Sequence, residues 1–581
     1  MKFFHVYNED YFEGLVKNGL INEDSAFKLQ HVFSLEADKK FNRFAAKGSE
    51  LYSFIRENRF PFYVDRIAGG VTYHHYDFDK DLIDEYRELL DGWFLGFQQH
   101  ETGGNRFYDW NNVRKMMNGE PGPYDAEELK RKSVLDYAKT PEGETLYGFV
   151  QGTPEEYAAK RAPATVTEAL ADLKDLFERR MSEVNGLVLP CDSNHLLTHM
   201  QNRLGMRAFM PEVGCQIPHM RVAVALARGM AKAYQKKWGV YYECWRTVQP
   251  YIGPTMPCFN DDPGNEWNLT QEAHRDDFTT YGPFGGSSRY LQKRIYFYSL
   301  MAGARFLSEE WGLNCSYLEM NGDFPLSPYG EAKKEFIEFS RSHRDVKAIV
   351  PFAVVLPAEH PLLRLQELEK PIGKRKNTAF GLDLSEGEID LMGRVDDVLK
   401  LIFSRDPDSI RGNEGHVLQN SRFGDLFDII YEDAPKAALS GYELLIDTTA
   451  GGRIAKDNPA LPVVTFNGKN FDDLARLINE KSREILPVRA DRFLWLISED
   501  ENGKYLSVFN NEGNDRNVEW GDRVISEADG TATIGTKEGV ELSVLWASHE
   551  RTSLSRLDDL NYSLFLPAAS FAVICLGNNN H

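Results

Sequence analysis

Seven acidic residues stand at or directly after short apolar segments of this 581-residue chain. They are Asp65, Glu101, Asp192, Glu212, Glu243, Glu309 and Glu310. Two carboxyl groups that face one another can break a glycosidic bond: one protonates the leaving oxygen, and the other attacks or stabilises the anomeric centre. Spacing alone does not select the pair, because each residue can equally bind a sugar hydroxyl or form a structural ion pair.

The region from 205 to 311 shows how such residues would be positioned. Short strand-like segments at 207–212, 239–243 and 305–310 each end in a carboxylate, and helical patterns at 218–234 and 289–302 separate them. Strands joined by helices of this length predict a parallel sheet, in which every strand ends on the same side. The carboxylates at these strand ends are therefore expected to share one edge.

The same pattern extends toward the N-terminus and gives eight strands, which is the number that closes a (β/α)8 barrel. The predicted strands are 2–8, 27–34, 60–66, 93–101, 186–192, 207–212, 239–243 and 305–310. This order places Glu101 on the fourth strand and Glu243 on the seventh. A polar insertion at 105–165 and an aromatic one at 246–288 interrupt the pattern. The aromatic insertion suits either a sugar-stacking platform or a lid or subunit contact.

We expect three domains in an α/β chain: a (β/α)8 TIM barrel at 1–344, an α/β domain at 345–488 and a C-terminal β-sandwich at 489–581. The middle domain carries no G-x-G-x-x-G, no P-loop and no cysteine, so neither a nucleotide fingerprint nor a thiol nucleophile is present in it. A structural or oligomerising role is the simpler expectation for this domain.

Composition narrows the class of protein. A net charge of −21 argues against a nucleic-acid surface, which needs clustered Lys and Arg. No run of eighteen or more apolar residues predicts a membrane span, and charge appears too early for a secretory signal. We therefore expect a soluble cytoplasmic protein with no membrane or nucleic-acid partner and no cofactor.

One spacing is compatible with a metal site. Cys191, His195 and His199 are four residues apart and would share a face of a helix. The predicted strand ends near Cys191, however, and would remove that residue from the helix, so no metal is the preferred interpretation. A metal-dependent hydrolase remains an alternative.

The residues at 95–104, Leu-Gly-Phe-Gln-Gln-His-Glu-Thr-Gly-Gly, resemble the fourth-strand signature of clan A glycoside hydrolases, especially the family 42 β-galactosidases. Tyr242-Glu243 with the aromatic insertion, and Glu310-Trp311 on the last strand, match the seventh and eighth strands of that family. The segments 423–430 and 439–445 are similar to its second domain, a relative of the class I glutamine amidotransferase fold that forms trimers. The resemblance thus covers the layout of nearly the whole chain.

The resemblance implies a retaining exo-β-glycosidase that acts on an oligosaccharide or small glycoside by double displacement, and a homotrimer. It makes Glu101 the acid/base and Glu243 the nucleophile, with the two carboxyls about 5 to 5.5 Å apart. The expected substrate-binding residues are Asp65, Arg66, His100, Glu212, Tyr242, Trp245, Trp267, Glu310 and Trp311. For the aromatic residues among them, packing in the core is an equal alternative.

Two departures from the family pattern leave the sugar open. His100 replaces the usual Asn before the acid/base, and Tyr242 replaces Met on the seventh strand. A β-mannoside or β-glucuronide therefore stays an alternative to a β-galactoside, with Arg66, Arg246 or Arg275 as a partner for a carboxylate. A strand register shifted by one unit would make Glu212 or Glu310 the nucleophile. A non-catalytic carbohydrate-binding barrel is the rival interpretation from another class.

Overall fold

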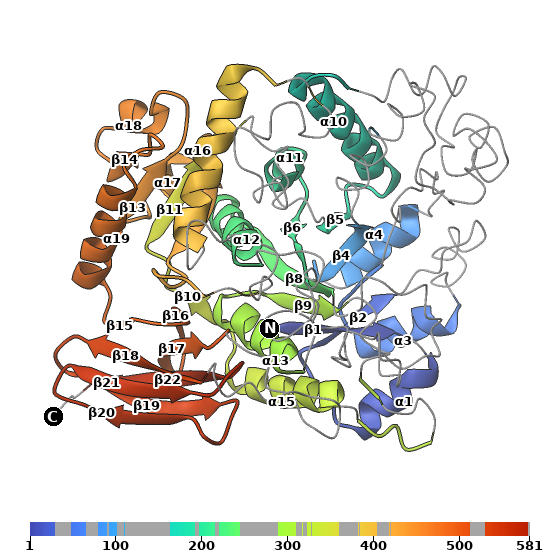
Figure 1. The fold of residues 1–581 in the computed structure, drawn as a ribbon. Coiled ribbons are helices and arrows are strands. Elements are labelled where there is room, and N and C mark those ends of the chain that lie inside the picture. The colour runs from blue at the N-terminus through green and yellow to red at the C-terminus, as the bar shows by residue number, and fades with distance from the viewer. Residues whose placement is uncertain are drawn as a thin grey trace, which may run out of the picture. The chain divides into compact units, whose positions relative to one another are not determined.

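The fold was obtained as a computed structural model (Figure 1). It describes residues 1–7, 9–29, 48–64, 80–89, 92–100, 110, 163–191, 197–214, 220–243, 289–309, 316–317, 322–326, 328–358, 382, 384–403, 418, 420–511 and 529–578. At His100 and Glu243 only the backbone is described. The chain divides into two compact units, the first with residues 1–25, 212–359 and 391–581 and the second with 26–211 and 360–390.

The predicted barrel strands are confirmed. They are β1 (Lys2–Tyr7), β2 (Ser25–Leu29), β3 (Phe62–Val64), β4 (Phe94–His100), β5 (Val188–Cys191), β6 (Ala208–Phe209) with β7 (Glu212–Gly214), β8 (Lys237–Glu243) and β9 (Phe306–Glu309). The order of the sheet is β5-β4-β3-β2-β1-β9-β8-β6, with β7 also pairing with β8. Because β5 and β6 follow one another in the chain, this order describes a nearly closed parallel barrel of eight strand positions.

The sixth barrel strand is split into two short strands, β6 and β7. The sequence predicts one strand over 207–212, whereas β6 and β7 are separated by Met210 and Pro211. Proline lacks the backbone N–H that a strand ladder needs, so the ladder is interrupted there. Counted as one position, β6 and β7 leave β4 as the fourth barrel strand and β8 as the seventh.

The barrel helices in the described part of the chain include the two predicted at 218–234 and 289–302. They are α3 (Glu50–Asn58), α4 (Lys80–Leu89), α10 (Val166–Glu183), α11 (Thr198–Arg203), α12 (Met220–Tyr234), α13 (Arg289–Met301) and α15 (Pro328–Ser342). In addition, α1 (Glu9–Lys17) follows β1 and was not predicted. The start of α10 is fixed by a capping box, in which Thr165 and Glu168 bond each other's backbone N–H groups.

In the second unit, aromatic side chains join the strands to their helices. Phe27 of β2 meets Phe54 of α3 edge-on, with ring centroids 5.8 Å apart. Phe62 of β3 meets Tyr86 of α4 in the same way at 5.0 Å. Strand side chains alternate between faces, so these contacts identify the face of β2 and β3 that is turned toward the helices. Lys28 and Tyr63 lie on the opposite, inner face.

In the first unit, a smaller parallel sheet follows the barrel. Its strands are β11 (Phe352–Leu356), β12 (Phe427–Tyr431), β13 (Leu444–Asp447) and β14 (Val463–Thr465), in the order β12-β11-β13-β14. Its helices are α16 (Glu386–Phe403), α17 (Lys436–Leu439), α18 (Arg453–Asp457) and α19 (Phe471–Ile485). The predicted α/β character of this region is confirmed, whereas its likeness to the amidotransferase fold stays a prediction.

A buried ion network joins α12 to β12 within the first unit. The Arg228 guanidinium lies 2.9 Å from an Asp425 carboxylate oxygen and 2.6 Å from one of Asp428. The hydroxyls of Tyr298 and Tyr442 donate to the same two carboxylates. All five side chains are buried. Since burial of charge is costly unless each group is paired, the network fixes one arrangement of α12 against the sheet.

The segment 347–356 forms two separate short strands. β10 (Lys347–Ala348) pairs in antiparallel fashion with β16 (Leu494–Asp500), while β11 begins only at Phe352, after Pro351. One segment therefore contributes to two sheets, because proline breaks the ladder between them.

The C-terminal strands, drawn in orange to red in Figure 1, belong to two antiparallel sheets, one of which also includes the earlier strand β10. One contains β10, β16 (Leu494–Asp500), β17 (Gly503–Phe509), β22 (Phe571–Asn578) and β19 (Val540–Ala547). The other contains β15 (Val488–Ala490), β18 (Gly530–Thr536), β21 (Asn561–Leu566) and β20 (Ser553–Arg556). The predicted all-β character of this region is confirmed.

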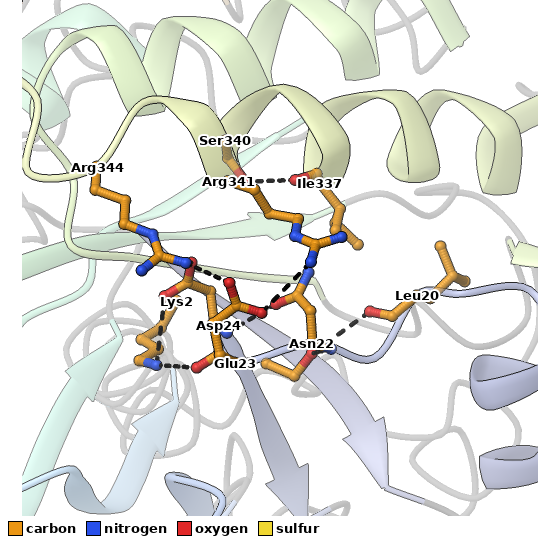
Figure 2. Close-up of polar contacts among 10 residues, drawn as sticks. Lys2, Leu20, Asn22, Glu23, Asp24, Ile337, Ser340, Arg341 and Arg344 are labelled. Carbon is orange, nitrogen blue, oxygen red and sulfur yellow. Dashed lines mark hydrogen bonds and ion pairs between the residues drawn. The ribbon is translucent and has the colours of Figure 1, made fainter. Parts of the chain in front are cut away.

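A charged cluster ties α15 to the start of the barrel (Figure 2). Lys2 donates to the Glu23 carbonyl oxygen at 2.6 Å, and Arg344 pairs with both Glu23 and Asp24. Arg341 lies 3.7 Å from the Glu23 carboxylate. Lys2 marks the N-terminal end of β1, and in barrel enzymes that end serves stability rather than chemistry. Among the described residues, no helix is long and apolar enough to cross a membrane.

Candidate active site

The outer face of β1, β8 and β9 is identified by its contacts with helices α13 and α15. Phe3 of β1 meets Tyr296 of α13 edge-on at 5.8 Å and lies 6.3 Å from the Phe336 ring of α15. Tyr242 of β8 meets Tyr296 edge-on at 6.3 Å. Glu309 of β9 binds side chains of both helices. Because side chains alternate along a strand, the residues next to Phe3, Tyr242 and Glu309 occupy the inner face.

A layer of inner-face residues follows from the strand register. Glu212 of β7 is the partner of Tyr241, Tyr241 of Ser308, and Ser308 of Phe4. All four side chains are buried, with Glu212 only 1% exposed. Partners in a parallel ladder lie on the same face, so the predicted substrate-binding residue Glu212 belongs to the inner face of the barrel.

Glu243 is the last residue of β8, and its backbone is paired with Gly214. Position 243 lies two residues beyond Tyr241 and one beyond Tyr242. It therefore shares the inner face with Tyr241 and is opposite to Tyr242. The register thus brings positions 212 and 243 to one face of neighbouring strands, at the carboxyl end of the sheet.

Glu309 is used on the outer face. Its carboxylate lies 2.6 Å from the Lys333 ammonium of α15 and 3.3 Å from the Gln292 amide nitrogen of α13, and it accepts a hydrogen bond from Tyr296. Lys333 also donates to the Ser316 hydroxyl at 2.6 Å. The Glu309 carboxylate is therefore bound between the sheet and its helices. Glu310 is then the acidic residue of this segment that remains a candidate for the active site.

His5 lies on the same outer face, two residues beyond Phe3, with the two rings 5.0 Å apart. Burial and the nearby Lys333 charge lower the pKa of His5 to about 3. The imidazole is therefore neutral at physiological pH. It packs against Phe3 on the outer face of β1 and adds no positive charge beside that of Lys333.

Tyr242 does not have the position expected of a sugar platform. Its side chain is fully buried and packs against α13 on the outer face of β8. The sequence left packing in the core as the alternative for this residue, and the contact with Tyr296 supports that alternative. The sequence alone could not distinguish the two, because the face of a strand depends on its register.

In the second unit, β4 carries two buried glutamines directly before its end. Its register pairs Val64 with Phe97 and Tyr63 with Gly96, after an irregularity at the start of the strand. Gln98 and position 100 therefore share the inner face with Tyr63. Among the described residues, neither amide atom of Gln98 has a hydrogen-bond partner. Gln98 was not among the site residues predicted from the sequence, although its spacing of two from His100 is the relevant signal.

The remaining predicted site residues lie outside the described residues. These are Asp65, Arg66, Glu101, Trp245, Trp267, Glu310 and Trp311, together with the side chains of His100 and Glu243. The backbone of β4 is described up to His100, the residue before Glu101. Their roles stay predictions.

The possible metal ligands are only partly described. Cys191 is the last residue of β5 and the register partner of His100, whereas His199 lies on α11. The side chains of Cys191 and His199 are buried. His195 lies outside the described residues. Among the residues that are described, no group of three or more His, Cys, Asp or Glu side chains could hold a metal ion.

No family model and no curated protein matches this chain. Among solved structures, it is similar to α-L-fucosidase isoenzyme 2 from Paenibacillus thiaminolyticus, with 10% identity, coverage of 99% of this chain and 97% of that chain, and a TM-score of 0.41. It is also similar to the β-galactosidase from Rahnella sp. R3, with 9% identity, coverage of 99% and 98%, and a TM-score of 0.35. At TM-scores this low, the similarity assigns no family and no activity to this chain.

Proposed function

We propose that this protein is a retaining exo-β-glycosidase in which Glu101 is the acid/base and Glu243 the nucleophile. The observation that supports this most is the position of Glu243, the last residue of the seventh barrel strand, on the inner face and at the carboxyl end. In (β/α)8 barrel enzymes, catalytic groups stand at the carboxyl ends of strands. Glu101 follows the last residue of the fourth strand, His100.

The proposed reaction has two steps. Glu101 protonates the glycosidic oxygen while the Glu243 carboxylate attacks the anomeric carbon, which releases the leaving group and forms a glycosyl ester with Glu243. Glu101, now a carboxylate, takes a proton from water, and this water attacks the anomeric carbon to release the sugar with its configuration retained. Each step exchanges one bond at the anomeric carbon, so no cofactor is consumed.

Glu212 is proposed to bind a sugar hydroxyl below the nucleophile. Its register partner is Tyr241, which lies two residues before Glu243 on the same face of β8. Glu212 is therefore on the inner face, one layer of side chains before position 243. A carboxylate accepts hydrogen bonds from hydroxyls, and a buried one does so without competition from bulk water. Asp65, Arg66, His100, Trp245, Trp267, Glu310 and Trp311 complete the proposed set, and Tyr242 no longer belongs to it.

We propose that the substrate is a β-galactoside, with a β-mannoside or a β-glucuronide as alternatives.

We also propose that the protein forms a homotrimer through the second α/β domain. Sedimentation velocity of the full chain tests this point, since a monomeric mass at micromolar concentration would contradict it.

The proposed function is tested with 4-nitrophenyl β-glycosides of galactose, mannose, glucose, glucuronic acid and fucose. We expect hydrolysis of at least one of them, with NMR showing the β-anomer as the first product. An inverted product would contradict the retaining mechanism. Hydrolysis of none of them would favour a non-catalytic carbohydrate-binding barrel.

The role of Glu101 is tested by the dependence on the leaving group. In Glu101→Ala, kcat/KM, which reports the first step alone, is expected to fall far more for substrates with a poor leaving group, such as methyl β-glycosides, than for 2,4-dinitrophenyl β-glycosides, whose leaving group departs without protonation. Glu178→Ala is the control, because Glu178 is an exposed carboxylate on α10. Equal loss on both leaving groups would contradict the acid/base role.

A further inference from the structure

A buried polar network lies behind the carboxyl ends of β8 and β9, on the outer face of the sheet. At its centre the Tyr296 hydroxyl donates to the Glu309 carboxylate and accepts from the Gln292 amide. The Lys333 ammonium lies 2.6 Å from a Glu309 carboxylate oxygen and also donates a hydrogen bond to the Ser316 hydroxyl. Tyr296 and Gln292 are fully buried, and Glu309 and Lys333 are only 1% and 3% exposed.

The network fixes the Tyr296 ring in one place. Its hydroxyl has both a donor and an acceptor partner, and its ring is enclosed by Phe3 at 5.8 Å and Phe336 at 5.2 Å. Hydrogen-bonded networks in a low-dielectric interior are strong only when each member is satisfied in one geometry. The ring is therefore a rigid surface against which a strand can pack.

The strand that packs there is β8, through the residue next to the proposed nucleophile. The Tyr242 ring meets the Tyr296 ring edge-on at 6.3 Å. Tyr242 is also the register partner of Glu309 on β9. Tyr296 thus contacts the outer-face residues near the ends of both strands, Tyr242 on β8 and Glu309 on β9. Glu243 is the residue directly after Tyr242.

We propose that Tyr296, through its bond to the Glu309–Lys333 pair, is a positioning residue for the Glu243 carboxylate. This inference rests on the proposed function, since it assigns a nucleophile to position 243. Tyr296 touches no substrate; it sets the place of Tyr242 from behind the sheet and thereby the place of the next residue. A nucleophile displaced by about 1 Å loses a large share of its rate, whereas sugar binding is affected less.

The variant Tyr296→Phe removes the hydroxyl and keeps the ring. A matched control is Tyr298→Phe, two residues along the same helix. Tyr298 is equally buried, and its hydroxyl donates to Asp425 at 3.0 Å, away from β8 and β9. Both variants lose one buried hydrogen bond to a carboxylate, and Tyr296→Phe also loses the bond from the Gln292 amide, so both are expected to lower the midpoint of thermal unfolding, Tyr296→Phe by the larger amount.

The test measures covalent labelling of the full chain by the 2,4-dinitrophenyl 2-deoxy-2-fluoro-β-glycosides of galactose and glucose. Intact mass and peptide mapping locate the label, and the burst of dinitrophenolate gives its rate. We expect the wild type and Tyr298→Phe to be labelled on Glu243 at the same maximal rate. Tyr296→Phe should be labelled at least about tenfold more slowly, with the half-saturating probe concentration unchanged.

Labelling of Tyr296→Phe at the wild-type rate, or equal slowing of both variants, overturns the inference and leaves the proposed function intact. A label on another carboxylate, or no label on the wild type with either probe, contradicts the proposed nucleophile and the inference with it. The two failures are therefore distinguishable from the wild-type result alone.

Discussion

Individual residues in this barrel are constrained by close approaches that a side chain would prevent. Gly96 of β4 has a φ of 104°, and a Cβ built there would lie 2.1 Å from the Leu187 carbonyl oxygen. That oxygen accepts the Phe97 N–H, so it cannot move away without loss of a ladder bond. Glycine is therefore required four residues before the end of the strand that leads into Glu101.

We predict that Gly96→Ala lowers the free energy of unfolding by about 3 kcal/mol or more, because left-handed strain and a backbone clash act together. Gly186→Ala is the matched control in the same unit. Gly186 has a φ of 76°, but the nearest atom to its Cβ would be the Met181 methyl carbon at 3.8 Å. Its cost should be about 1 kcal/mol. Equal costs in denaturant unfolding would show that the clash is relieved.

His5 predicts a dependence of stability on pH. Its pKa is lowered from the ordinary 6.5 to about 3 by burial and by the Lys333 charge. Between these values the unfolded chain binds a proton that the folded chain does not, so stability falls as the pH is lowered through 6.5. Between pH 7 and pH 5 the loss from this residue is about 2 kcal/mol.

The variant His5→Asn cannot take up this proton. Its unfolding free energy, measured by urea titration at both pH values, should fall by about 2 kcal/mol less than that of the wild type. An unchanged pH dependence would mean that His5 titrates normally in the folded protein.

At the scale of elements, the joint between α12 and β12 combines charge pairing with close packing. Arg228 bonds Asp425 and Asp428, and it donates to the Phe427 carbonyl oxygen at 2.9 Å. At Gly229, the next residue, a Cβ would lie 2.3 Å from the Ile429 carbonyl oxygen. The helix can approach the strand so closely only because this position has no side chain.

We predict that Arg228→Met costs about 3 to 5 kcal/mol, because it removes the cation that pairs with Asp428 and the nearer of the two cations that pair with Asp425, which keeps only Arg221 at 3.6 Å. The control is Arg476→Met, which removes an exposed pair with Asp473. Its effect should stay within about 0.5 kcal/mol. A loss below about 1 kcal/mol for Arg228→Met in denaturant unfolding would mean that water or another cation replaces the guanidinium.

The elements also show which parts of the fold the sequence could predict. Strand number and order followed from alternating apolar segments and helices, and all eight barrel positions were found at their predicted places. The interruption of the sixth strand at Pro211 was missed, although proline is a direct signal for it. The short strand Ser553–Arg556 is mostly exposed, so it offers no apolar pattern to detect.

The candidate site was harder to predict than the fold. Which carboxylate faces inward depends on the register between strands, and a shift of one residue reverses every face. Glu309 and Glu310 could not be distinguished from sequence, and only the contacts with Lys333 and Gln292 show that Glu309 is used outside the barrel. The burial of Tyr242 and its contact with Tyr296 explain why Tyr242 is core rather than platform.

At the scale of the whole molecule, the central proposal is that Glu243, the last residue of β8, is the nucleophile of a glycosidase. Glu243→Ala is the direct test, because it removes the carboxylate and opens space for a small anion. With a 2,4-dinitrophenyl β-glycoside, the variant should lose about 10³-fold or more in rate, in keeping with the loss of a reacting group.

Added azide should then restore turnover by attacking the anomeric carbon from the vacated side, and NMR should show the α-glycosyl azide. This result would establish Glu243 as the nucleophile and the enzyme as retaining. Full activity of Glu243→Ala without azide would contradict the central claim.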